Sequence, residues 1–313
     1  MNLCTIDIGT NTTLLLVARV SPGAPPERLE ERAEITRLGR GIGAGGALGA
    51  EGIARTLAVL REYADVARRH GAKVAAVGTE ALRRAPNAAA FLEPAAEILG
   101  APVEVIDGQR EAALTFRAVA ESFPDALAGA LTVIDIGGGS TEIVIATRGV
   151  VKHNASLPLG SVRLTERFIR HDPPRPDELA AVADTVDAAL AGVPFPVPAA
   201  QPVTLVGVAG TVTSLAAMAE ALSSYDPARV HGYRLSREAL AEQIARLRVG
   251  TQAARERIVG LDPRRADVIL AGALILERIA MAARVTEVRV SDRGIRWGLV
   301  HELASGIGER GVA

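Results

Sequence analysis

Several features common in other protein classes are scarce in this chain of 313 residues. Cys4 is the only cysteine, so no intramolecular disulfide and no cysteine-rich metal site can form, which fits a reducing cytoplasm. Aromatic residues make up 3%, too few for a base-stacking platform, and a net charge of −1 gives no global attraction for nucleic acid. No apolar stretch reaches the roughly 18 residues of a membrane-spanning helix, and the opening MNLCTIDIG carries no basic leader. The sequence therefore predicts a cytoplasmic protein that binds neither nucleic acid nor a membrane.

The chain alternates between strand-like and helix-like segments, and its length exceeds what one ordinary core holds. Helices are expected over 51–69 and 109–121, and over most of the chain beyond Pro176. Runs rich in β-branched residues predict strands at 5–9, 14–20, 31–39, 73–79, 102–106, 131–137, 141–147, 203–209 and 287–292. This order predicts an α/β protein with right-handed crossovers and helix-covered sheets.

An internal repeat is the most informative feature of the sequence. A shift of 128 positions (135 − 7) lays TIDIGTNTTLLLVA over VIDIGGGSTEIVIA without a gap. Unrelated apolar strands would share aliphatic residues, but not the Asp-Ile-Gly core followed by a polar turn at the same offset. The repeat predicts two homologous halves that face each other. Six identical pairs carry it: Ile6 and Ile134, Asp7 and Asp135, Ile8 and Ile136, Gly9 and Gly137, Thr13 and Thr141, and Ala18 and Ala146.

Each copy of the repeat consists of a strand, a tight polar turn and a second strand. Glycine lets the backbone approach a ligand closely and point successive N–H groups at one spot. Hydroxyl and amide side chains add further donors, so each turn suits a phosphate. One copy alone is equally compatible with an ordinary hairpin turn, and it is the matched pair that favours phosphate. The candidate phosphate-binding residues are Thr10, Asn11 and Thr12 in the first turn and Gly137, Gly138, Gly139 and Ser140 in the second.

Three carboxylates are candidate metal ligands. Asp7 and Asp135 end buried apolar strands, where an uncompensated charge is costly. Glu142 should lie across the hairpin turn from Asp135 and could face the same ion, although it could also be a solvated strand residue. Oxygen ligands without cysteine or clustered histidine favour magnesium over zinc.

A third glycine-rich turn, GVAGTVTSLAAM, ends an apolar strand and opens a helix near Thr211. Free N–H groups at a helix N-terminus can bind an anion, so Gly210 and Thr211 are further phosphate-binding candidates. Alternatively, Gly207 and Gly210 let the helix pack on its strand. No Walker A sequence is present, which argues against the commonest nucleotide-triphosphatase fold. The loop from Gly39 to Gly49 could form the edge of a cleft, but its spacing is a weak signal.

IDIGTNT and IDIGGGSTE resemble the two phosphate motifs of the actin, sugar-kinase and heat-shock-chaperone ATPase superfamily. Other segments resemble, in order and across nearly the whole chain, the exopolyphosphatase and guanosine pentaphosphate phosphatase family (Ppx/GppA): AVGTEALRRAPNAAAFL, EVIDGQREAALTF, LPLGSVRLTERF, GVAGTVTSLA, DPARVHGYRLS, RADVILAGALIL and VSDRGIRWGLV. The resemblance implies two ribonuclease-H-like (actin-like ATPase) α/β domains with an interdomain active-site cleft. We expect domains over 1–125 and 126–313, with a last helix, about 293–307, packing back on the first domain. The length resembles that of the short form, which stops after these two domains.

The resemblance also implies roles for single residues. Glu111, in GQREAA, matches the catalytic glutamate that activates or orients the attacking water. Asp135 and Glu142 match the carboxylates that hold Mg²⁺ (or Mn²⁺), and Arg83 matches a phosphate-contacting arginine. The chain departs from the family where Gln109 and Arg110 replace glutamates before Glu111, and where Trp297 replaces a glutamate.

The expected reaction is magnesium-dependent hydrolysis of the terminal phosphoanhydride bond of inorganic polyphosphate, which releases orthophosphate. The alternative substrate is guanosine pentaphosphate. A kinase of the same superfamily and a non-catalytic sensor of either compound are further alternatives, and a homodimer is compatible with the resemblance. The roles of several arginines stay open between a polyanion track and a solvated surface: Arg163, Arg167, Arg170, Arg264, Arg265, Arg293 and Arg296. A structural role is expected for His231.

Overall fold

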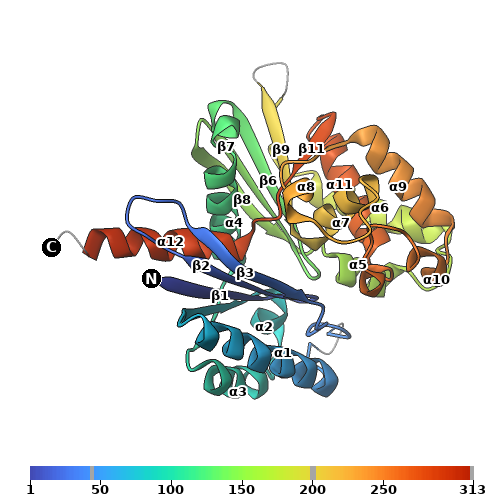
Figure 1. Ribbon diagram of the computed structural model, residues 1–313. Helices are drawn as coiled ribbons and strands as arrows, with labels where there is room; N and C mark the ends of the chain where they lie inside the picture. The colour runs from blue at the N-terminus through green and yellow to red at the C-terminus, as the bar shows by residue number, and fades with distance from the viewer. Residues whose placement is uncertain (43–45, 198–201, 311–313) are drawn as a thin grey trace. The chain divides into compact units, whose positions relative to one another are not determined.

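The chain folds as two units, each built around its own β-sheet (Figure 1). The computed structural model describes residues 1–42, 46–197 and 202–310. The first unit contains Met1–Ala118 and Ile295–Ala313, and the second contains Val119–Gly294. Part of the glycine-rich loop from Gly39 to Gly49, residues 43–45, lies outside the described residues.

The first sheet has five strands in the order β3-β2-β1-β4-β5. β1, β2 and β3 form an antiparallel meander, whereas β4 and β5 run parallel to β1. The strands are β1 (Asn2–Ile8), β2 (Thr13–Arg19), β3 (Glu27–Glu34), β4 (Lys73–Gly78) and β5 (Val103–Val105). The helices are α1 (Ala50–Arg69), α2 (Glu80–Arg84), α3 (Ala89–Leu99), α4 (Gly108–Ser122), which continues past Ala118, and α12 (Ile295–Arg310).

The two faces of the first sheet are covered by different helices, as Figure 1 shows for α1 and α3 on one side and α12 on the other. Cys4 and Ile6 of β1 pack in one cluster with residues of α1 and α3. Leu3 packs on the opposite face with α12, and the hydroxyl of Thr5 donates to the carbonyl of Arg296 in that helix at 2.9 Å. Because side chains alternate along a strand, Asp7 shares the face of Leu3 and Thr5.

The second sheet has six strands in the order β10-β11-β9-β6-β7-β8. The strands are β6 (Ala130–Ile136), β7 (Thr141–Thr147), β8 (Val150–Leu157), β9 (Val203–Val208), β10 (Arg234–Ser236) and β11 (Glu287–Val290). β8 and β10 lie outside the segments in which the sequence predicts strands. The helices are η1 (Pro124–Ala128), α5 (Ser161–Phe168), α6 (Pro176–Leu190), α7 (Ala209–Ala219), α8 (Pro227–Val230), α9 (Arg237–Val249), α10 (Gln252–Arg255), η2 (Pro263–Arg265) and α11 (Ile269–Ala282).

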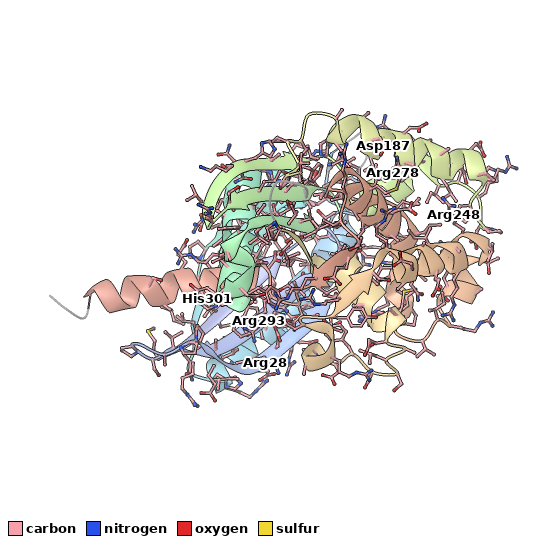
Figure 2. All side chains as sticks on the ribbon, turned by 90° about the horizontal axis from the view of Figure 1, so that it is seen from above. Arg28, Asp187, Arg248, Arg278, Arg293 and His301 are labelled. Atoms are coloured by element: carbon pink, nitrogen blue, oxygen red, sulfur yellow. The ribbon has the colours of Figure 1, made fainter. Side chains whose placement is uncertain are left out.

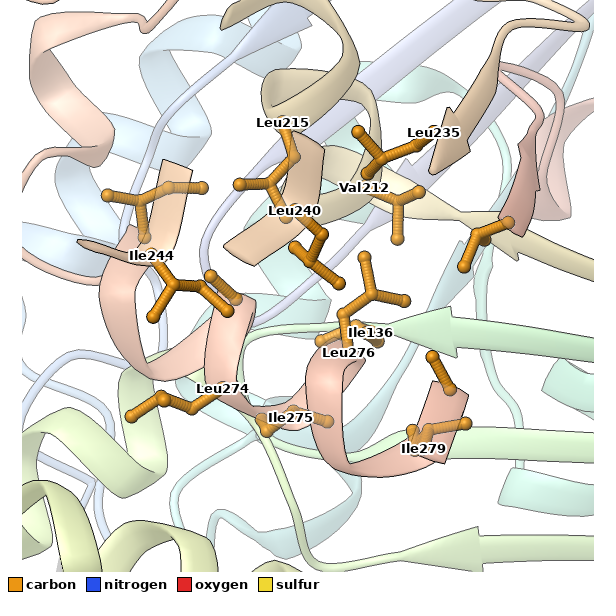
Figure 3. Packing of buried hydrophobic residues seen from close by; sticks show 14 of the residues in the cluster. Ile136, Val212, Leu215, Leu235, Leu240, Ile244, Leu274, Ile275, Leu276 and Ile279 are labelled. Carbon is orange, nitrogen blue, oxygen red and sulfur yellow. The ribbon is translucent and has the colours of Figure 1, made fainter. Parts of the chain in front are cut away.

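Helix α11 is at the centre of the core of the second unit. Residues Ile269 to Leu276 of this helix are all buried, so its first two turns are apolar on every side rather than along one stripe. Leu276 lies beside Ile136 of the sheet (Figure 3), and Ile279 and Val212 of α7 belong to the same cluster. This packing fixes α7, and with it the third glycine-rich turn, against the sheet.

The two sheets repeat the same construction. The order β3-β2-β1-β4-β5 matches β8-β7-β6-β9-β11, and β10 is an additional edge strand. The register shifts between Val17 and Ala18 in the first sheet and between Ile145 and Ala146 in the second. These two irregularities are 128 residues apart (145 − 17), the offset of the sequence repeat. A β-bulge at the same place in both copies supports their origin as one duplicated unit.

Candidate active site

Three parallel strands of the first unit end at one edge of the sheet. The register pairs Ile8 of β1 with Gly78 of β4, and Gly78 with Val105 of β5. The first polar turn, helix α2 and helix α4 follow these strand ends. The carboxyl ends of parallel strands are where α/β sheets usually bind ligands, and here they bring the first turn, Arg83 and Glu111 to one edge.

The first polar turn is held by the loop that follows β3. The N–H of Gly9 donates to the carbonyl of Thr12 at 3.0 Å and closes the turn. The N–H of Gly39 donates to the carbonyl of Thr10 at 2.8 Å, and the N–H of Arg37 donates to the carbonyl of Asn11 at 2.9 Å. A Cβ on Gly39 would lie 2.5 Å from the Cγ2 of Thr10, so the glycine permits this close approach.

The side chains of this turn are buried but polar. Asn11 is 7% exposed, and within the described part of the chain its Nδ2 is buried without a hydrogen-bond partner. A buried donor without an acceptor costs about 1–3 kcal/mol, which a ligand oxygen would relieve. The hydroxyl of Thr10 lies 3.4 Å from the Oε2 of Glu80, a buried carboxylate that also pairs with Arg84 at 3.1 Å. Thr12 is half-buried beside them.

Glu111 is placed by the first turn of α4. The carboxylate of Asp107 accepts the N–H of Arg110 at 2.8 Å, and the carbonyl of Asp107 accepts the N–H of Glu111 at 3.0 Å. Arg83 reaches from α2, where its Nη1 donates to the carbonyl of Ile106 at 2.6 Å and lies 3.4 Å from the Oε2 of Glu111. Glu111 is 6% exposed. The structure therefore brings the candidate phosphate-contacting arginine and the candidate catalytic glutamate into contact.

The second unit pairs two buried carboxylates. Asp135 on β6 lies directly opposite Glu142 on β7, and their exposures are 7% and 1%. The hydroxyl of Ser156 on β8 donates to the Oε1 of Glu142 at 2.6 Å. A Cβ on Gly294 would lie 4.0 Å from the Oδ2 of Asp135, so the turn after β11 also lies beside this pair. In the first unit, the residue opposite Asp7 is Leu14.

The second polar turn has the hydrogen bond of the first. The N–H of Gly137 donates to the carbonyl of Ser140 at 3.0 Å. The carbonyl of Gly138 accepts the N–H groups of Val162 and Arg163 at the start of α5, each at 3.0 Å. The Nε of Arg163 donates to the carbonyl of Gly139 at 2.6 Å, so this arginine holds the turn rather than lying in solvent.

The third glycine-rich turn joins β9 to α7. Ala209 has φ +70°, a left-handed conformation that costs a non-glycine residue about 1–2 kcal/mol. A Cβ on Gly210 would approach the guanidinium of Arg265 closer than 3.0 Å, and a Cβ on Gly272 would lie 2.6 Å from Thr211. Burial lowers the pKa of Arg265. The glycines permit packing here, and the guanidinium of the half-buried Arg265 lies beside the turn and adds positive charge.

Trp297, whose role the sequence leaves open, and His231, for which a structural role is expected, both have structural partners. Trp297 is buried with Leu3 and Val300, and its indole N–H donates to the Oε1 of Glu31 at 3.1 Å. His231 stacks on Phe123 with ring centroids 4.8 Å apart.

The repeated sheets and their glycine-rich turns define a two-domain protein of the actin-like ATPase type. The model of the Ppx/GppA phosphatase family matches residues 16–305. The chain therefore belongs to the Ppx/GppA phosphatase family. No helix in the described ranges is both long and apolar enough to cross a membrane.

Relatives match over the full length of the chain. Exopolyphosphatase 2 of Mycobacterium tuberculosis is 37% identical over 316 residues, covering 96% of this chain and 97% of that protein. The crystal structure of an exopolyphosphatase from Cytophaga hutchinsonii has a TM-score of 0.90 at 28% identity and covers 98% of both chains. The structure of the Aquifex aeolicus Ppx/GppA enzyme has a TM-score of 0.81 at 36% identity, covering 97% of this chain and 99% of that one.

Proposed function

We propose that this protein is an exopolyphosphatase that hydrolyses the terminal phosphoanhydride bond of inorganic polyphosphate and releases orthophosphate. The observation that carries the proposal is the pair of buried carboxylates, Asp135 opposite Glu142, at a glycine-rich turn. The chain is also similar over its full length to a protein named exopolyphosphatase. A cytoplasmic location is proposed because the single cysteine, Cys4, leaves no intramolecular disulfide to form, which fits a reducing compartment.

The carboxylate pair fits Mg²⁺ or Mn²⁺. No group of three or more histidine, cysteine, aspartate or glutamate side chains that could hold a metal occurs among the described residues. Magnesium commonly takes only one or two protein carboxylates and completes its shell with water and substrate phosphate oxygens. Asp135 and Glu142 would hold the ion, and Asp7 is the equivalent candidate ligand in the first repeat. The bound ion would neutralise charge on the phosphates of the substrate.

The polar turns would bind the phosphates through their backbone N–H groups and short side chains. Asn11, with its buried Nδ2 donor, is the best-supported contact in the first turn. Arg83 would donate to a phosphate oxygen from the side on which it already contacts Glu111. The complete proposed set is Thr10, Asn11, Thr12, Arg83, Gly137, Gly138, Gly139, Ser140, Gly210 and Thr211.

Glu111 would accept a hydrogen bond from the attacking water and align it with the terminal phosphorus. Phosphoryl transfer depends mainly on positioning and charge neutralisation, so an oriented water needs little covalent assistance. The cap from Asp107 and the contact with Arg83 restrain this carboxylate in part before substrate binds.

The test is phosphate release, with magnesium, from polyphosphate and guanosine pentaphosphate side by side. Glu111→Gln should lower kcat by about 10²–10⁴-fold with little change in KM, because it removes a water-orienting carboxylate. Glu121→Gln is the matched control, since Glu121 is exposed in the same helix.

Each outcome of this assay selects one function. Release of orthophosphate without any acceptor excludes a kinase. Faster release from guanosine pentaphosphate than from polyphosphate would identify guanosine pentaphosphate as the substrate. Binding of either compound without turnover would identify a sensor and overturn the proposed hydrolase.

A further inference from the structure

The residue directly before Glu111 makes a two-pronged ion pair with the C-terminal helix. The Nη1 of Arg110 donates to the Oε2 of Glu302 at 2.6 Å, and its Nη2 donates to the Oε1 of the same carboxylate. The two positions are 192 residues apart in sequence. Their side chains are 36% and 33% exposed. Hydrogen bonding to Arg110 lowers the pKa of Glu302, so the pair is charged at neutral pH.

The ion pair continues a close contact between α4 and α12 within the first unit. Leu114 lies one helical turn after Arg110 and so faces the same side of α4. A Cβ on Gly298 would approach the carbonyl of Leu114 closer than 3.0 Å, which means that the two backbones touch. Leu114 also packs with Ile295 and Leu299 of α12. The ion pair is therefore the polar end of an apolar helix–helix contact.

We infer that the Arg110–Glu302 pair positions Glu111 for catalysis by tying the first turn of α4 to α12. This inference rests on the proposed role of Glu111. The first turn of a helix lacks the full ladder of backbone bonds and opens most easily. Arg110 and Glu111 are adjacent in that turn, so a restraint on Arg110 limits the movement of Glu111. The contact from Arg83 to Glu111, at 3.4 Å, is a longer and weaker restraint.

A loss of charge and a loss of positioning should change the activity of the Glu302→Gln variant in opposite directions. Glu302→Gln removes a negative charge, and charge alone would therefore favour a polyanionic substrate. Positioning predicts the opposite result, a lower kcat, because the fork on Arg110 is lost while its charge remains. Arg110→Gln should lower kcat in the same way, and it can also raise KM because it removes a positive charge.

The experiment measures kcat and KM for phosphate release from polyphosphate with magnesium. Glu302→Gln and Arg110→Gln should each lower kcat by about three- to tenfold, and Glu302→Gln should leave KM within about twofold. The exchanged pair, Arg110→Glu with Glu302→Arg, should recover most of the lost kcat. Arg278→Gln is the matched control because Arg278 forms a similar fork with Asp187 in the second unit (Figure 2). It should leave kcat unchanged.

Three outcomes would overturn the inference. One is an unchanged kcat in Glu302→Gln, the second is an equal loss in Arg278→Gln, and the third is an exchanged pair no better than the single variants. Hydrogen exchange of the Arg110, Glu111 and Ala112 amides gives a readout independent of activity. Arg110→Gln should speed their exchange by about three- to tenfold, and unchanged exchange would show that the pair does not hold the helix.

Failure of the proposed function is recognised separately. If the unaltered protein releases phosphate from neither substrate, the role of Glu111 fails, and the catalytic half of the inference fails with it. Faster amide exchange in that case would retain the pair as an anchor of α4 alone. If the unaltered protein is active but Glu302→Gln matches it, only the inference is lost.

Discussion

Gly160 offers a sharp steric test of the second phosphate turn. It lies just before α5 with φ −140° and ψ 150°, an extended conformation that any residue adopts. Its substitution by alanine therefore adds no backbone strain. A Cβ at this position would lie closer than 3.0 Å to the carbonyl of Gly138 and to the backbone of Gly139. The turn would have to retreat by about 1 Å to restore ordinary contact.

The retreat would have two measurable consequences. The carbonyl of Gly138 accepts the N–H groups of Val162 and Arg163, and both bonds would lengthen. Overpacking against backbone costs about 1–3 kcal/mol, which corresponds to a fall in Tm of roughly 2–12 °C for a unit of this size. A displacement of about 1 Å in a group that binds the reacting phosphate lowers kcat by about 10²-fold.

Thermal unfolding and steady-state phosphate release on Gly160→Ala measure both effects. The matched control is Gly192→Ala in the same unit, because a Cβ on Gly192 meets nothing within 4 Å. The control should retain the Tm and kcat of the unaltered protein. If Gly160→Ala lowered the Tm but kept the kcat of the unaltered protein, the displaced turn would not bind the reacting phosphate, and the placement of Gly137 to Ser140 at the active site would be refuted.

Two further predictions concern carboxylates. Glu142→Gln keeps an acceptor for the hydroxyl of Ser156 but loses the charge, so the magnesium concentration for half-maximal rate should rise by about tenfold or more. Ser156→Ala serves as control, and an unchanged magnesium titration would remove Glu142 from the metal site. Burial alone would raise the pKa of Glu178. Three hydrogen bonds outweigh this effect and lower the pKa from 4.5 to about 2; they come from the N–H of Arg175, the ring of His171 and the N–H of Arg170. The ionised Glu178 therefore stabilises the fold fully above pH 4.5, and this contribution is lost as the pH falls toward 2. The difference in free energy of unfolding between the unaltered protein and Glu178→Gln should shrink over that range. A constant difference in urea unfolding from pH 6 to 2.5 would contradict this assignment.

The sequence predicts the repeated hairpins well because their information is local. Strong alternation, the Asp-Ile-Gly core and the polar turn specify strand, turn and strand within about fourteen residues. The register that sets Glu142 opposite Asp135 follows from the turn length. The family resemblance adds Glu111 and Arg83, which have no local pattern of their own.

Other features could not be predicted because they depend on distant partners. β8 carries the polar run Lys152 to Asn154, and it is a strand because it pairs with β7 at the sheet edge. β10 is only three residues long. The partner of Trp297 is Glu31, 266 residues away in the sequence. Such pairs are specified by tertiary packing and leave no periodic signal.

The two copies of the duplicated unit carry different side chains at equivalent positions. Asp135 faces Glu142, whereas the equivalent Asp7 faces Leu14, so only the second copy offers a pair of carboxylates to a metal ion. Each copy also places a helix after its last parallel strand. The helix after β5, α4, has Glu111 in its first turn, whereas the helix after β11, α12, has no acidic residue there.

The specialised groups are therefore divided between the copies. In the proposed function, the second copy would neutralise phosphate charge through its metal ion, and the first would orient water through Glu111. Phosphoryl transfer requires both at once, because charge must be stabilised on the phosphoryl oxygens while the nucleophile is aligned behind the phosphorus. If this division is correct, Glu111→Gln should lower kcat without changing the magnesium requirement, and Glu142→Gln should change the magnesium requirement first.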